Sequence, residues 1–272
     1  LPLVWLSLAL GGFTLIFWGL DTRPFSAAFK LAGSSMLTLG FFDVDDLARL
    51  VVAFFAAALT ISVLGILLVT YLPTIYTAYS SRETTVTALE SFAGEPPRAP
   101  EMLTRMYRIG GWERLDEIWA EWRLWFAEAQ ETHTALPALA LFQSSHPNRS
   151  WVGAVGVVLD AAALKVSLTD AFDAEAQLCI RSGFLTLREI AVSFDFEFDP
   201  DPRPDDPISV TREEFDRVVA ELEGVGIELQ QDLEDAWIAF AGWRVNYDTV
   251  LNQLAELVGA RDVTLERLSL RL

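Results

Sequence analysis

In one short stretch a hydroxyl-bearing residue and a glycine stand among apolar residues: Thr38, Leu39, Gly40, Phe41 and Phe42. Backbone carbonyls of such a stretch can replace the water that an ion loses when it enters a narrow pore. A non-helical segment of this kind cannot face lipid, because its backbone polar groups would lack hydrogen-bond partners there. The residues therefore predict an ion filter held inside a protein assembly.

Acidic residues follow this stretch: Asp43, Asp45 and Asp46. Around a fourfold axis they would form a ring of carboxylates, which concentrates cations at the mouth of a pore. An ordinary solvated loop explains Asp45 and Asp46 equally well. We therefore predict that these three residues form the outer mouth of the pore. For Asp45 and Asp46, a solvated loop remains an equal alternative.

A second acidic group lies much later in the chain, at Asp195, Glu197, Asp199 and Asp201. Carboxylate oxygens are the ligands that Ca²⁺ and Mg²⁺ prefer. The stretch lacks the glycine and the terminal glutamate of an EF-hand loop, and its prolines stiffen it. A solvated linker is the preferred interpretation, and a divalent-ion site is the alternative.

No catalytic pattern is evident in the remaining residues. His133 and His146 lack partners at metal-ligand spacing, and no glycine-rich phosphate loop follows a predicted strand. No nucleophile stands with a base in a motif. We expect no enzymatic activity and a structural role for both histidines.

Two long uncharged runs flank the candidate filter, at residues 1–20 and 50–81. Each reaches the ~20 apolar residues that a membrane-crossing helix needs. Between them, Pro24 predicts the first turn of a helix over 24–37, which is too short to span a bilayer. The second span is predicted over 47–79.

The order of span, short helix, Thr-x-Gly-aromatic, acid and span resembles the pore of the two-transmembrane, one-pore-loop potassium channels, whose filter reads Thr-Val-Gly-Tyr-Gly-Asp. The resemblance covers about residues 1–83. It implies a homotetramer that conducts K⁺, with the innermost oxygens from Thr38. It also implies gating by bending of the second span, where Gly65 and Pro73 are the candidate hinges.

The sequence departs from the family pattern at two filter positions. Phe42 replaces the second filter glycine, which is used where the backbone needs a positive φ. Phe41 lacks the hydroxyl of the family's tyrosine. Because a filter widened at its outer end would pass Na⁺ as well, a non-selective cation channel is an alternative.

Composition separates an apolar part from an acidic part. The mean hydropathy is +0.30, yet the net charge of the 272 residues is −18, and the acids gather beyond Arg82. We expect a transmembrane pore domain over 1–83 and an acidic, helical, cytoplasmic domain over 84–272. The acidity argues against nucleic acid as a partner. The single cysteine, Cys179, excludes an internal disulfide.

The acidic part is predicted to be helical, with a strand only at 194–198. The expected helices lie at about 80–93, 101–109, 112–132, 151–168, 173–192, 211–223, 228–241 and 243–259, with capping boxes at Ser80/Glu83 and Thr211/Glu214. The run 151–168 could form a third span, but Asp160 and Lys165 would each cost ~3 kcal/mol at bilayer depth. A buried helix of a soluble domain is therefore favoured.

The sequence thus predicts an all-α membrane protein of the plasma or inner membrane, with two transmembrane helices, a re-entrant pore helix and filter, and a soluble C-terminal domain. Its predicted function is cation conduction, biased by an unknown cytoplasmic ligand or a divalent ion. The alternative from another class is a membrane-anchored interaction or sensory protein with a non-conducting loop.

Overall fold

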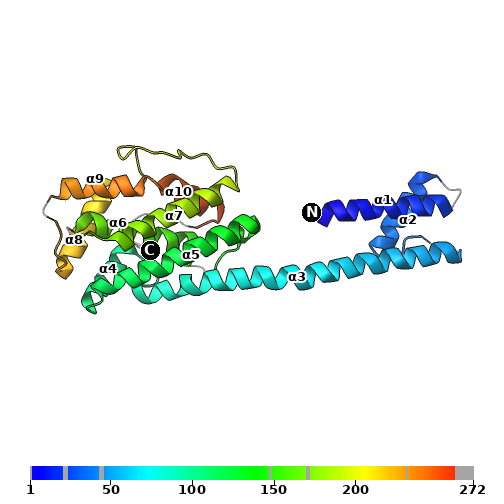
Figure 1. The fold of residues 1–272 in the computed structure, drawn as a ribbon, viewed down its shortest axis with the longest axis horizontal. Helices are drawn as coiled ribbons and strands as arrows, with labels where there is room; N and C mark the ends of the chain where they lie inside the picture. The colour runs from blue at the N-terminus through cyan, green and yellow to red at the C-terminus, as the bar shows by residue number, and fades with distance from the viewer. Residues whose placement is uncertain are drawn as a thin grey trace, which may run out of the picture. The chain divides into compact units, whose positions relative to one another are not determined.

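The structure is a computed structural model that describes residues 2–20, 24–42, 46–146, 149–169, 172–230 and 232–260. All regular secondary structure in these residues is helical (Figure 1). The chain divides into two compact units, Leu1–Thr74 and Ile75–Leu272, called here the first and second units. The predicted boundary at 83/84 lies inside one long helix, α3 (Leu47–Ala93), which contributes residues to both units.

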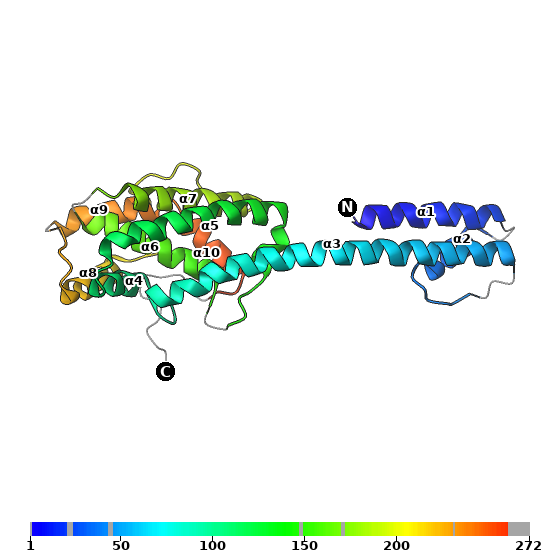
Figure 2. The same cartoon turned by 60° about the horizontal axis from the view of Figure 1, so that its bottom comes forward.

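The first unit consists of α1 (Pro2–Leu20), α2 (Phe25–Met36) and the beginning of α3. Pro24 is extended (φ −62°, ψ 150°), and α2 begins directly after it. A small core of Phe17, Ala28, Leu31 and Ala32 joins α1 to α2, and Val52 and Ala53 of α3 pack against it. Figure 2 shows α1 and α2 alongside this part of α3.

The third helix continues without a break from Leu47 to Ala93. The predicted end near residue 79 and the capping box of Ser80 with Glu83 are therefore wrong. Both residues lie inside the helix, where Thr84 Oγ1 also donates to Ser80 O at 2.8 Å. Each added residue brings one more backbone bond, so a helix does not stop at polar residues without a breaker.

Two described helices are long and apolar enough to cross a membrane: α3 and α6 (Trp151–Leu168). They differ in burial, because the most apolar window of α3 is 11% buried and that of α6 is 83% buried. Apolar side chains along α3 thus lie uncovered by the chain itself, whereas α6 is a core helix. The favoured interpretation of residues 151–168 as a buried helix is confirmed.

The second unit surrounds α6. The other helices that the structure describes there are α4 (Ala99–Arg108), η1 (Trp112–Arg114), α5 (Leu115–Ala135), η2 (Pro137–Leu141), α7 (Ala174–Val192), α8 (Arg212–Val225), α9 (Leu233–Arg244) and α10 (Asp248–Leu257). α6 packs against α4, α7, α9 and α10, and α5 packs along α7 (Figure 1). The two charges that disfavoured a span are paired, Asp160 with Arg244 and Lys165 with Asp173.

Local capping signals account for the helix boundaries near the end of the chain. The capping box of Thr211 and Glu214 is confirmed, since each side chain accepts from the other's backbone N–H. Asp232 caps α9 by accepting from Glu234 N and Asp235 N, so this helix begins later than the predicted residue 228. The strand predicted at 194–198 is wrong: this segment is a loop whose phenylalanines pack on the core.

Candidate functional site

The candidate filter begins where α2 is capped. Leu39 N donates to Ser34 O at 2.8 Å, and Thr38 N donates to Ser35 O at 3.1 Å, the two bonds of a Schellman motif. Thr38 occupies the left-handed position of this motif, with φ +54°. Glycine is the usual residue there, because a side chain branched at Cβ is strained at positive φ. The cap ends the helix and turns the chain into residues 38–42.

Ser34 fastens the loop to the helix. Its side chain is buried, and its hydroxyl accepts a hydrogen bond from Phe41 N at 3.1 Å. Together with the bond from Leu39 N to its carbonyl, one residue of α2 holds the loop at two places. Sequence reasoning missed Ser34, because nothing local shows that the chain folds back within reach of it.

Positive φ recurs two residues later, at Gly40 (φ +67°). A Cβ at Gly40 would meet no atom within 4 Å, so glycine is needed here for its backbone conformation and not because a side chain would clash. Among described non-glycine residues, only Thr38 and Asp195 have positive φ. Phe42, which stands where the family has its second filter glycine, is not among the residues with positive φ, whereas Thr38 is.

The loop exposes its apolar side chains in the single chain. Phe41 is 73% exposed, and Leu39 and Phe42 are 48% and 42% exposed. Uncovered phenylalanine and leucine side chains in a contiguous stretch mark an interaction surface. The loop of the first unit thus presents apolar side chains that the described chain leaves uncovered.

The predicted outer mouth is described only at Asp46, since Asp43 and Asp45 lie outside the described residues. The Asp46 carboxylate accepts from Arg49 N at 3.3 Å and lies 3.9 Å from the Arg49 guanidinium. This is the geometry of a helix N-terminal cap, which accounts for Asp46 by local structure.

The two predicted hinge residues both lie within continuous α3. Pro73 has no N–H to donate to the preceding turn, and a Cβ at Gly65 would meet no atom within 4 Å. Around Pro73, Thr74 Oγ1 donates to Thr70 O at 2.8 Å. The boundary between the two units follows Pro73 by one residue.

The predicted divalent-ion residues are not brought together. In the part of the chain that the structure describes, no three His, Cys, Asp or Glu side chains gather as a metal-binding group. Asp199 Oδ1 instead accepts from Asp201 N at 2.8 Å, and Glu197 O accepts from Gln253 Nε2 at 3.0 Å. The geometry gives the metal interpretation no support.

Arg82 and His133 form a buried polar cluster that sequence reasoning also missed. Arg82 donates from Nη1 to Leu139 O at 2.9 Å and from Nη2 to Phe142 O at 2.6 Å. Its Nη1 lies 3.5 Å from His133 Nε2, and Nδ1 of the imidazole lies 2.8 Å from Ala129 O. Burial, aided by the charge of Arg82, lowers the pKa of His133 to about 4. Both side chains tie the second half of α3 to its neighbours.

A second buried network joins three helices. Arg244 is fully buried and pairs with Asp160 of α6 and, at 2.8 Å, with Asp248 of α10. Tyr247 donates from its hydroxyl to Asp160 at 2.8 Å. The only signal in the sequence was the presence of Asp160 in an apolar run.

The site thus comprises a capped short helix and a pinned, exposed loop between apolar helices. No protein-family model matches the sequence, and neither a curated protein nor a solved structure gives a match.

Proposed function

We propose that the chain is one subunit of a homotetrameric cation channel, with residues 38–42 as the ion filter and K⁺ as the expected permeant ion. The observation that carries this proposal is the construction of the loop. A helix too short to span a bilayer ends in a cap at Thr38, and Ser34 holds the following residues in a non-helical path. An assembly of several copies would give such a backbone an environment free of lipid.

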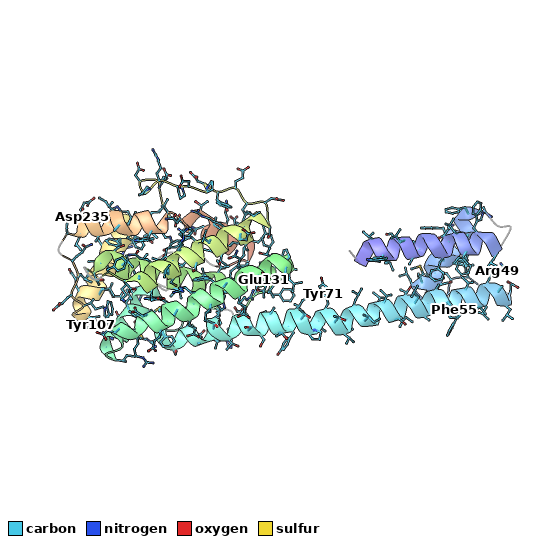
Figure 3. The ribbon with its side chains drawn as sticks, in the orientation of Figure 1. Arg49, Phe55, Tyr71, Tyr107, Glu131 and Asp235 are labelled. Carbon is cyan, nitrogen blue, oxygen red and sulfur yellow. The ribbon has the colours of Figure 1, made fainter. Side chains whose placement is uncertain are left out.

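The surfaces of α1 and α3 support a membrane setting. Trp5 and Trp18 of α1 are 64% and 51% exposed, and Phe55 and Tyr71 of α3 are 61% and 53% exposed. The side chains of Phe55 and Tyr71 are labelled along α3 in Figure 3. From Leu47 to Tyr71 a helix rises about 36 Å at 1.5 Å per residue. This exceeds the ~30 Å hydrocarbon core, and tryptophan and tyrosine favour its two boundaries. The first unit is then the pore domain.

The second unit is proposed to lie in the cytoplasm and to bias the pore through α3. Its core holds the later half of that helix, through Arg82 and through Glu90, which pairs with Arg149 at 2.7 Å. Pro73, next to the boundary between the units, is the proposed hinge. The net charge of −18 on each chain would attract cations toward the assembly.

Ion flux into liposomes tests the proposal, with K⁺, Na⁺ and Mg²⁺ supplied in turn. We expect K⁺ flux, and Gly40→Ala should lower it at least tenfold, because alanine is strained at φ +67°. Gly110→Ala is the matched control: Gly110 has φ +69°, and its Cβ would also meet no atom within 4 Å, but it lies in the second unit. This variant should leave flux unchanged.

Each other outcome has a defined meaning. Equal flux in wild type and Gly40→Ala would reject residues 38–42 as the filter. No cation flux from a folded wild-type chain would favour a membrane-anchored sensory protein. Equal passage of K⁺ and Na⁺ would show a non-selective pore, and passage of Mg²⁺ would show a divalent-cation pore.

A further inference from the structure

A cavity of about 200 Å³ lies in the second unit, where the loop after α7 passes over the junction of α9 and α10 (Figure 1). Its walls include the rings of Phe198 and Pro202. Polar groups reach it from Arg188 of α7, from Asp199 and Asp206 of the loop, and from Asn246 and Thr249 near the start of α10; the carboxylate of Asp206 is already paired with Arg203 at 3.2 Å. Apolar walls with a few polar groups are typical of a small-molecule site.

Arg188 supplies a fixed positive charge to this cavity. Its Nε and Nη2 donate to Asn246 O at 3.1 and 2.9 Å, and its Nη1 donates to Pro200 O at 2.7 Å. The guanidinium also lies 4.8 Å from the Phe184 ring centre. Its Nη2 also lies 3.4 Å from the side-chain oxygen of Asn246. Neutral oxygens thus orient the cation, while no carboxylate of the described chain lies within 4.0 Å of it. Such a charge is available to an anionic group of a ligand.

Asp199 supplies the opposite charge. One carboxylate oxygen, Oδ1, accepts from Asp201 N at 2.8 Å, and this bond fixes the side chain at the loop. Arg188 and Asp199 line the same cavity. Burial lowers the pKa of Arg188, and the charges of Asp199 and Asp201 oppose this lowering. The cavity lining therefore offers a positive group, Arg188, and a negative group, Asp199.

We propose that this cavity binds a small zwitterion of amino-acid size, with its carboxylate on Arg188 and its ammonium group on Asp199. The volume lies below the ~300 Å³ at which sites for drug-sized ligands begin, which selects a small ligand. Phe198 and Pro202 accept a short apolar side chain. We expect the zwitterion to act as a regulatory ligand of the second unit, a role that rests on the proposed channel function. Its binding to the cavity does not depend on conduction.

Thermal unfolding and calorimetric titration of the full chain in detergent test this site. The probes are L-alanine, L-serine, L-threonine and L-proline at millimolar concentration. Propionate and ethylamine, which each carry one of the two charges, serve as probe controls. We expect at least one amino acid to raise the melting temperature and neither single-charge compound to do so.

Two variants assign the binding to this cavity. Asp199→Asn removes the charge but keeps an oxygen that accepts from Asp201 N, and it should raise the Kd about tenfold or more. Thr249→Trp fills the cavity from an exposed position and should abolish binding. Asp195→Asn is the matched control, because it removes a charge from the same loop outside the cavity lining and asparagine tolerates the positive φ at this position, so its Kd should stay within about twofold of wild type.

Three results would overturn the proposal: no stabilisation by any of the amino acids, equal stabilisation by propionate, or an unchanged Kd in both Asp199→Asn and Thr249→Trp. Because the readout is binding, these results are separate from a failure of ion flux.

Discussion

Burial turns two ionisable residues, Arg82 and His133, into fixed hydrogen-bonding groups. The guanidinium donates to two backbone carbonyls and pairs with Glu83 at 2.9 Å, and His133 Nε2 faces it at 3.5 Å as an acceptor. A proton on Nε2 would place two positive charges side by side without solvent. The neutral imidazole is therefore part of the folded structure.

The stability of the second unit should depend on pH through His133. Its pKa is lowered from 6.5 to about 4 in the folded chain, so its contribution is fully present above pH 6.5 and is lost as the pH falls through 4. The loss should approach about 3 kcal/mol, at 1.36 kcal/mol per pKa unit. Chemical denaturation at a series of pH values measures it.

Carboxylates also titrate at low pH, and a control variant separates the two effects. His133→Gln keeps a polar side chain and removes the titrating imidazole. The difference between the wild-type and variant curves should be steepest between pH 6.5 and 4. Parallel curves across this range would show that His133 does not carry the effect.

The contact between α2 and the loop that follows it depends on a single side-chain hydroxyl, that of Ser34. Ser34→Ala removes the acceptor for Phe41 N and should cost about 1 kcal/mol. A loosened loop should also lower the preference for K⁺ over Na⁺. Thermal unfolding and two-cation flux measure the two effects.

Ser35→Ala is the matched control for this test. It makes the same chemical change at the next position of α2 but leaves the bond of Ser34 to the loop intact. Equal effects of the two substitutions on selectivity would contradict the positioning role of Ser34.

Helix positions were predictable wherever the signal was local. The capping box at Thr211 and the proline before α2 placed helix starts within a residue or two. The length of α3 was not predictable, because the residues that looked like a new start at Ser80 are held by distant contacts. Ser81 Oγ, for example, donates to Glu128 Oε1 across 47 positions.

The candidate site was predictable only in part for the same reason. Gly40 and its neighbours could be recognised from residue types in order along the chain. Ser34, His133 and Arg244 could not, because their meaning depends on partners brought close by folding. The four carboxylates of 195–201 formed a pattern in the sequence that the folded loop does not gather in space.

For the whole molecule, the proposed channel requires a definite stoichiometry. Light scattering of the purified chain in mild detergent should give a protein mass of four times 30.3 kDa. The reason is that one copy leaves residues 38–42 and the apolar face of α3 uncovered. A mass of one or two chains from protein with native unfolding behaviour would exclude a fourfold pore.

The single cysteine offers an opportunity for spectroscopy. Cys179 is fully buried, and burial raises the pKa of its thiol, which keeps it protonated and poorly nucleophilic. A maleimide dye or spin label added to the native protein should find no reactive partner. A new cysteine at an exposed position of the second unit, such as Leu124→Cys in α5, would then carry the only probe, and distances between labels on neighbouring copies could be recorded without altering the natural thiol.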